Sequence, residues 1–153
     1  MATFEHRVET TVDRTPEASW IAATTLDGIV AELPWPMRLR TAPEVRTLDE
    51  LLVVGATVVA TLRFGPMPVL RWSPGLERLD VAARTFVETS TDMTWMRAWR
   101  HERRIVDLGD GRSRIEDRVS GESALPLAGM VVGALFRARH RRIGRGSSVR
   151  SSR

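Results

Sequence analysis

The sequence predicts an α+β fold, in which an antiparallel sheet is joined by two short helices early in the chain and one long helix at its end. Apolar and polar residues alternate from residue 4 to residue 12, the period of a half-buried strand. Two strand-like segments flank Asp110-Gly111, which favours a hairpin turn. Apolar residues recur at helical spacing after Pro126. Strands followed by a final helix are typical of an α+β domain.

Two short helices are expected directly after the first strand. Thr15-Pro16-Glu17 supplies an N-cap, a proline at the first helical position and an acid in the first turn, so a helix is predicted from Ala18 to Ala23. Gly28 interrupts the pattern. A second helical stretch over 29–33 is stopped by Pro34-Trp35-Pro36.

Further strands should fill the middle of the chain. Segments rich in Val, Thr and Leu predict strands over 52–64, 76–82 and 84–91, the first ending at Gly65-Pro66. The hairpin is expected to pair 95–107 with 112–123.

The last helix is predicted to begin at Pro126 and to lie close to the sheet. Its apolar positions are Leu127, Met130, Val131, Ala134, Leu135 and Ala138. Gly129 and Gly133 have the spacing of small residues that allow close packing. We expect one domain over residues 1–143 and a disordered basic tail over 144–153.

Composition limits the class of protein. A chain of 153 residues with 42% hydrophobic and 27% charged residues has the size and balance of one globular domain. It has no cysteine, which excludes disulfides, thiolate metal sites and cysteine nucleophiles. A strand pattern that opens at residue 4 leaves no room for a signal peptide, so we expect a cytoplasmic protein. The apolar run over 124–136 is shorter than the ~20 residues of a bilayer span.

The basic residues are all arginine and are concentrated at the C-terminus. Residues 137–153 hold seven of the 23 arginines and no acid, which leaves the rest of the chain mildly acidic. Three interpretations are open: favourable charge at a helix C-terminus, contact with anionic lipid headgroups, or contact with nucleic acid. The first is favoured, and a nucleic-acid partner is the least favoured.

Several motifs of well-known chemistry are missing. His101-Glu102-Arg103-Arg104 is followed by Ile105, so the second histidine of a His-Glu-x-x-His zinc site is absent. The sequence has no Walker loop, no Gly-x-Gly-x-x-Gly and no Gly-x-Ser-x-Gly. We therefore expect no metal and no cofactor.

Six short segments, in this order, resemble the START-like, or SRPBCC, superfamily with its helix-grip fold. They lie at 27–34 with 37–39, and at 62–69, 86–90, 99–103, 115–119 and 136–142, and include Trp99-Arg100-His101-Glu102-Arg103 and Ile115-Glu116-Asp117-Arg118-Val119. The resemblance covers nearly the whole chain and is to an uncharacterised bacterial branch that binds ligands. It implies a curved antiparallel sheet around the C-terminal helix, with a largely apolar cavity between them. Relatives use such a cavity to bind lipids, sterols, polyketides or hormones, and some cyclise polyketides.

Three polar residues of the hairpin are the candidate catalytic or ligand-orienting groups. If the odd-numbered faces of both strands point inward, His101, Arg103 and Asp117 lie in or beside the cavity. They could orient a ligand carbonyl or hydroxyl, or exchange a proton with it. In the alternative interpretation, which is favoured, Arg103 and Asp117 form a buried ion pair and His101 bonds a neighbour.

Apolar residues are expected to line the same cavity. The predicted ligand contacts are Met37 and Leu39 at the rim, Trp99 and Met130 facing the cavity, and also Phe64, Phe86 and Val119. Trp20, Trp35 and Trp95 are more simply ordinary core residues. Glu32, just before the Pro34 stop, could face the mouth of the cavity, but a solvated acid at a helix end is the favoured interpretation.

The predicted function is binding of a small hydrophobic molecule, lipid-like or polyketide-like, between the sheet and the last helix. The alternative from another class is a polyketide cyclase or aromatase in which His101 with Asp117 or Arg103 moves protons. A third hypothesis is peripheral contact of the arginine-rich C-terminus with a membrane surface or nucleic acid. The ligand, catalytic competence and oligomeric state are open at this point.

Overall fold

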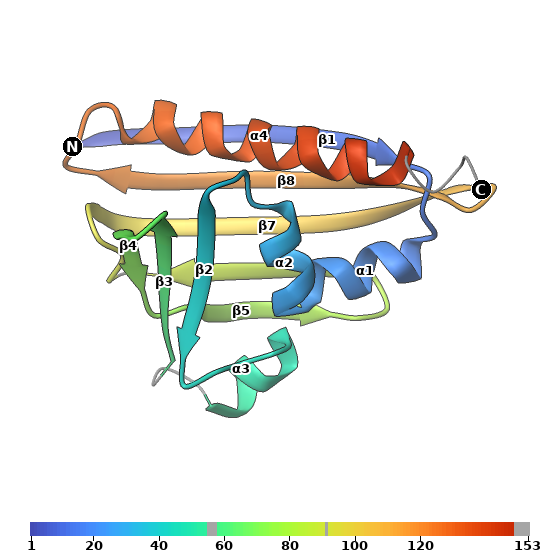
Figure 1. Cartoon of the computed structure of the whole chain (residues 1–153), viewed down its shortest axis with the longest axis horizontal. Helices are drawn as coiled ribbons and strands as arrows, with labels where there is room; N and C mark the ends of the chain where they lie inside the picture. The colour runs from blue at the N-terminus through green and yellow to red at the C-terminus, as the bar shows by residue number, and fades with distance from the viewer. Residues whose placement is uncertain (55–57, 91, 149–153) are drawn as a thin grey trace.

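The computed structural model describes residues 1–54, 58–90 and 92–148, which form two antiparallel sheets and four helices (Figure 1). The elements follow in the order β1 (Ala2–Val12), α1 (Pro16–Thr24), α2 (Leu26–Glu32), β2 (Met37–Ala42), α3 (Leu48–Val54), β3 (Val59–Phe64), β4 (Met67–Trp72), β5 (Gly75–Asp80), β6 (Thr85–Ser90), β7 (Met96–Gly109), β8 (Arg112–Ser123) and α4 (Ala128–Ser148). None of the described helices has a stretch long and apolar enough to cross a bilayer.

The larger sheet has five strands in the order β1-β8-β7-β6-β5, and the smaller has three in the order β2-β3-β4. The smaller sheet, α1, α2 and α4 all lie on one side of the larger sheet (Figure 1). The predicted hairpin between β7 and β8 is confirmed. Its turn holds Gly109, Asp110 and Gly111 at φ values of 75°, 56° and 71°, the left-handed region that Asp-Gly sequences tolerate.

Alternation along β7 and β8 sets which side chains enter the interior. His101, Arg103 and Ile105 are buried on β7, and Ser113, Ile115, Asp117 and Val119 are buried on β8. Arg103 and Asp117 are directly opposite each other in the register. The odd-numbered faces of both strands therefore point inward, as their sequence alternation predicts.

Short polar contacts fix α1 on the sheet. The Thr15 side chain accepts a hydrogen bond from the Ala18 amide at 3.2 Å, which is the predicted N-cap. One turn later, Ser19 is fully buried and its hydroxyl lies 2.7 Å from the hydroxyl of Ser113 on β8. The start of α1 is thereby held against the inner face of the sheet.

Glycines allow α4 to lie directly on β1. A Cβ at Gly129 would come within 2.8 Å of the Phe4 Cβ, and one at Gly133 within 2.8 Å of the His6 ring. The His6 Nε2 donates to the Gly129 carbonyl at 2.7 Å. The predicted role of this glycine pair, close approach of the helix to the sheet, is confirmed.

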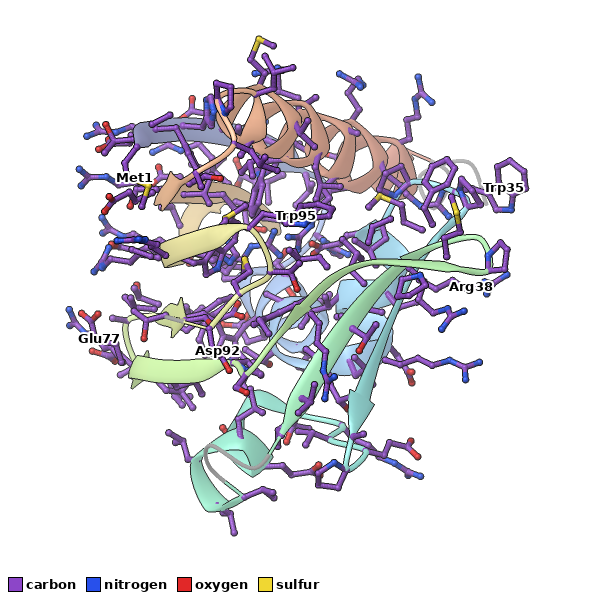
Figure 2. The ribbon with its side chains drawn as sticks, turned by 90° about the vertical axis from the view of Figure 1, so that its left-hand side faces the viewer. Met1, Trp35, Arg38, Glu77, Asp92 and Trp95 are labelled. Carbon is purple, nitrogen blue, oxygen red and sulfur yellow. The ribbon has the colours of Figure 1, made fainter. Side chains whose placement is uncertain are left out.

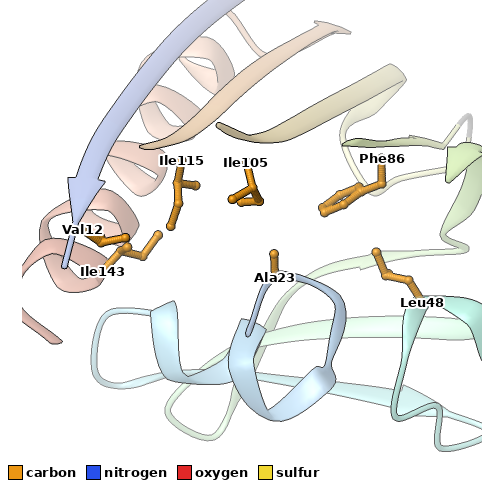
Figure 3. Packing of buried hydrophobic residues seen from close by; sticks show 7 residues of the cluster. All are labelled: Val12, Ala23, Leu48, Phe86, Ile105, Ile115 and Ile143. Carbon is orange, nitrogen blue, oxygen red and sulfur yellow. The ribbon is translucent and has the colours of Figure 1, made fainter. Parts of the chain in front are cut away.

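Buried apolar residues form two clusters between the layers. Figure 3 shows the first, in which side chains from both ends of the chain and from the sheet converge: Val12, Ala23, Leu48, Phe86, Ile105, Ile115 and Ile143. The second joins β7 and β8 to α4 and contains Met93, Met96, Val119, Val132 and Phe136.

The middle of the chain differs from the prediction. The strand predicted over 52–64 is divided: α3 ends at Val54, and β3 begins at Val59. A short apolar run does not distinguish helix from strand by its period, and Asp49 and Glu50 favour a helix start. β2 and β4 were not predicted as strands.

The end of the chain also differs. α4 continues to Ser148, so residues 144–148 are helical rather than part of a disordered tail. Residues 149–153 of that predicted tail lie outside the described residues.

Candidate functional site

An apolar cavity of about 140 Å³ lies between the two sheets and the helices. Its walls come from the inner faces of both sheets and from α1, α2, α3 and α4. Most of its lining is aliphatic or aromatic; these residues include Leu26, Ile29, Leu33, Leu39, Leu48, Leu51, Leu62, Leu70, Trp72, Phe86, Trp99, Leu135 and Phe136. A concave apolar space of this kind is the usual setting of a small-molecule site.

Five side chains able to carry charge also line the cavity: Glu88, His101, Arg103 and Arg139, together with Arg46, whose side chain is largely exposed. Glu88 and His101 are directly opposite each other on β6 and β7, and Arg139 comes from α4. These groups bring charge to a wall that is otherwise apolar. They are the polar groups available to orient a ligand.

Asp117 lies behind this wall and is the centre of a buried hydrogen-bond network. Its carboxylate accepts bonds of 2.7 Å from Nε and from Nη2 of Arg103. It also accepts from Nε2 of His101 at 3.0 Å and from Nε2 of His140 at 2.8 Å. The other ring nitrogen of His140 bonds the Thr10 hydroxyl at 2.9 Å. The network thus connects β7 and β8 to α4 and β1.

Glu32 extends the network to α2. Its carboxylate accepts from Nη1 of Arg103 at 2.8 and 2.9 Å and from Nη2 of Arg139 at 2.7 Å. Glu32 is only 6% exposed. The prediction of a solvated acid at a helix end is therefore wrong: two guanidinium groups compensate this carboxylate, and burial without them would be very unfavourable.

Burial and charge act in opposite directions on these groups. Burial raises the pKa of Asp117, but the Arg103 guanidinium and His101 outweigh it and hold that pKa well below its usual value. Burial likewise raises the pKa of Glu32, and Arg103 with Arg139 lowers it below its ordinary value. Both acids are therefore ionised at neutral pH.

His101 is shifted towards its charged form. Burial lowers its pKa, but the Asp117 carboxylate, followed by Glu88, raises it above the usual value. Nδ1 of His101 lies 3.8 Å from Oε2 of Glu88. The ring also packs edge-on against Phe86 and Phe136, with centroids 5.6 and 5.0 Å away. The imidazole is thus fixed in orientation and better suited to donate a proton than to accept one.

Glu88 has spare hydrogen-bond acceptor capacity at the cavity wall, where Nε1 of Trp99 and Nε of Arg139 are buried donors without a partner among the described residues. Its Oε1 accepts from the Trp72 indole at 3.0 Å, and its Oε2 makes the longer approach to His101. A carboxylate has about four lone-pair sites, so Glu88 retains acceptor capacity at the cavity. Within the described residues, no three His, Cys, Asp or Glu side chains are arranged to hold a metal ion.

Comparison with protein families finds a family model that matches residues 10–146. The chain belongs to the family described as Domain of unknown function (DUF8410). Among curated proteins, none matches this chain.

Solved structures show which fold this DUF8410 member has. A structural-genomics protein from Nitrosospira multiformis has a TM-score of 0.72 at 12% identity, over 97% of this chain and 99% of that one. The ZhuI aromatase/cyclase from Streptomyces sp. R1128 gives 0.66 at 14% identity, over 98% and 96%. A START superfamily protein from Mycobacterium smegmatis gives 0.60 at 11% identity, over 94% and 97%. The predicted START-like helix-grip fold is confirmed.

Five of the residues predicted for the site line the cavity of this DUF8410 member: Leu39, Phe86, Trp99, His101 and Arg103. Asp117 lies one layer deeper, in contact with two of them. Val119 belongs to the second core cluster. Met37 is half-buried at the start of β2 and is not part of the lining.

Phe64 and Met130 lie outside the cavity, contrary to prediction. Phe64 ends β3 beside the turn and is 50% exposed. Met130 is 63% exposed, because the buried stripe of α4 runs through Val132, Phe136 and His140. A residue two positions before Val132 is about 200° away from it around the helix, on the solvent side.

Three titratable residues of the site were not predicted for it, namely Glu88, Arg139 and His140, and Glu32 was considered only as a residue at the cavity mouth. His140 and Arg139 follow Phe136 by four and three positions, the spacing of a shared helix face. That spacing could have identified the buried face of α4, but the stripe through Met130 is more apolar and was predicted to be the buried face instead. Glu88 follows Phe86 by two positions on β6, so both side chains lie on the same face of the strand, which was a second signal.

Proposed function

We propose that this DUF8410 member binds a small, largely apolar molecule in the cavity between its two sheets and α4. The observation that carries the proposal is an apolar lining interrupted by a compact set of charged groups. Apolar walls supply the binding energy, and a few fixed polar groups select the orientation of the ligand.

The volume of the cavity limits what fits inside it. A dry apolar cavity of about 150 Å³ accepts a benzene ring. The present volume of about 140 Å³ therefore suits one ring, or the end of a longer lipid-like or polyketide-like molecule.

The charges around the cavity favour a neutral ligand that carries a polar group. With His101 protonated, three cations (His101, Arg103 and Arg139) balance Asp117, Glu32 and Glu88. The fifth charged group of the lining, Arg46, lies 3.6 Å from the Glu44 carboxylate, so each of these cations has an acidic partner among the described residues. The Glu88 carboxylate is available to accept a bond from a hydroxyl or amine at the apolar wall.

The first test is native mass spectrometry of the purified protein, followed by titration with phenol-sized ligands. Ala60 is 2% exposed and lines the cavity, so Ala60→Leu should fill part of the space and weaken binding at least tenfold. Ala98→Leu, at an exposed position on β7, is the matched control and should bind normally. If the protein binds no small apolar compound, or if both variants bind equally well, the proposal is wrong.

A cyclase-type enzyme is the second candidate, supported by the pairing of Glu88 and His101 at the cavity wall. In such a reaction His101 would donate a proton to a ligand carbonyl, while Glu88 would remove one from the adjacent carbon. His101→Gln should then abolish turnover of a poly-ketone substrate and retain its binding. If the parent protein shows no measurable turnover, and His101→Gln only weakens binding, the cyclase candidate is wrong and only the binding role remains.

A further inference from the structure

The outer face of the small sheet is strongly basic. β2, β3 and β4 carry four arginines and no acid: Arg38, Arg40, Arg63 and Arg71. Their neighbours Leu39, Leu62 and Leu70 line the cavity, so alternation directs the arginines to the opposite, outer face. Figure 2 shows Arg38 projecting away from the larger sheet.

These arginines are arranged without compensating charge. Arg38 and Arg63 are directly opposite each other in the register, and Arg40 and Arg71 both pair with Thr61. Like charges directly opposite one another destabilise a sheet. Within the described residues, none of the four arginines forms an ion pair. The face is therefore electrostatically complementary to an anionic surface outside the protein.

An apolar tip lies at one end of this basic face. Trp35 is 82% exposed, Met67 60% and Phe64 50%. The Gly65 amide donates to the Pro36 carbonyl at 3.2 Å, which holds the Trp35-Pro36 turn beside the β3–β4 turn. Trp35 lies at the outer edge of the molecule, on the same side as Arg38 (Figure 2). An exposed tryptophan between prolines is not the core residue that the sequence suggested.

The end of α4 extends the basic surface to this tip. A shallow groove runs from Pro34 and Trp35 to Arg141, Arg142 and Arg145, and no acid lines it. The Nε of Arg142 donates to the Ala31 carbonyl at 2.7 Å, which holds the charge next to the tip.

We propose that this surface docks on an anionic lipid bilayer, with the arginines of β2–β4 on the phosphates and Trp35, Phe64 and Met67 inserted among the headgroups. Arginine pairs with phosphate, and tryptophan prefers the boundary between water and acyl chains. Each basic side chain near an anionic membrane strengthens binding about fivefold. The strands carry no rings on their basic face, so a base-stacking platform for single-stranded nucleic acid is missing there. This docking is independent of the cavity ligand.

The test measures co-sedimentation of the full chain with vesicles of phosphatidylcholine alone and with about one-third phosphatidylserine, at low and physiological salt. We expect binding only to the anionic vesicles, decreasing with salt. The triple variant Arg38→Gln, Arg40→Gln, Arg71→Gln should lose roughly a hundredfold in partition coefficient.

A matched triple variant removes the same net charge elsewhere. Arg97, Arg104 and Arg112 are exposed on β7 and β8, and replacing them with Gln should leave most binding intact. Equal loss in both triple variants, or no binding to anionic vesicles, would overturn the proposal. Binding of single-stranded RNA through Arg38, Arg40 and Arg71 with no vesicle binding would also overturn it.

A second matched pair tests the apolar tip. Trp35→Ala should weaken vesicle binding several-fold and reduce quenching of tryptophan emission by brominated lipid. Trp95→Ala, at another exposed tryptophan, should change neither quantity. Identical behaviour of the two variants would exclude insertion of the Trp35 tip and refute the proposed docking mode.

Discussion

Replacing Glu32 with Gln is the sharpest test of the buried charge network. Glu32 accepts three hydrogen bonds from two guanidinium groups, all between 2.7 and 2.9 Å. Glutamine keeps one acceptor oxygen but places an amide donor against a guanidinium donor. Arg103 keeps Asp117 as a partner, whereas Arg139 loses the only carboxylate with which it pairs among the described residues.

The expected loss of stability follows from this arrangement. Removing one partner of a buried ion pair costs about 3–5 kcal/mol, and Arg139 is 8% exposed, so little water can replace the carboxylate. We expect about 4 kcal/mol, which is a large share of the ~5–15 kcal/mol that stabilises a typical domain. For a chain of this length the melting temperature should fall by about 8–16 °C.

Urea unfolding followed by circular dichroism measures the effect, provided that the m-value is unchanged. Glu5→Gln is the control, because Glu5 forms an exposed ion pair with Arg118 and should matter little. The double variant Glu32→Gln, Arg139→Gln removes one charge of each sign and should recover part of the loss. A Glu32→Gln change of less than about 1 kcal/mol would refute the buried network.

Three further predictions concern pH, a helix contact and the cavity wall. Asp117 and Glu32 have lowered pKa values, so their contribution to stability is complete above about pH 4.5 and is lost as the pH falls. His101 has a raised pKa, so its contribution to stability is complete below about pH 6 and is lost as the pH rises. Urea midpoints should therefore peak between these values, and His101→Gln should flatten the alkaline side; a flat profile in the parent protein would contradict this. Gly28→Ala should lower the free energy of unfolding by about 2–3 kcal/mol, since the added Cβ would lie 2.0 Å from the Ala22 carbonyl oxygen. Gly146 has open space around it, so Gly146→Ala should slightly raise the melting temperature. Glu88→Gln should reduce the preference for phenol over toluene about tenfold in calorimetric titrations, and Glu102→Gln, on the opposite face of the sheet, should not; equal preferences in both variants would remove Glu88 from the site.

Much of the fold could be predicted because its long elements have clear periods. β1, β7 and β8 are long alternating strands, and their inward faces follow from one choice of register. The small sheet was harder to recognise. β2 has alternating Met37, Leu39 and Thr41, but it is only six residues long and follows two prolines, whose stop signal dominates the local pattern.

The site was only half predictable, because its charged groups come from distant parts of the chain. The pair of Arg103 and Asp117 follows from the pairing of adjacent strands. Glu32 and Arg139 are 107 positions apart, and a single sequence contains no signal that brings them together. The buried face of α4 is also rotated about the helix axis relative to the predicted apolar stripe. Met130, which was predicted to be inside, is therefore exposed, and His140 is buried instead.

The wide sequence separation within the charge network has a consequence for folding kinetics. The bonds between Arg103 and Asp117 span 14 residues and can form with the β7–β8 hairpin, while water still reaches both groups. The bonds from Glu32 to Arg103 and Arg139 span 71 and 107 residues and require α2 and α4 to have docked. The Glu32 contacts should therefore be absent from the folding transition state, and their strength should determine how slowly the native protein opens rather than how quickly it forms.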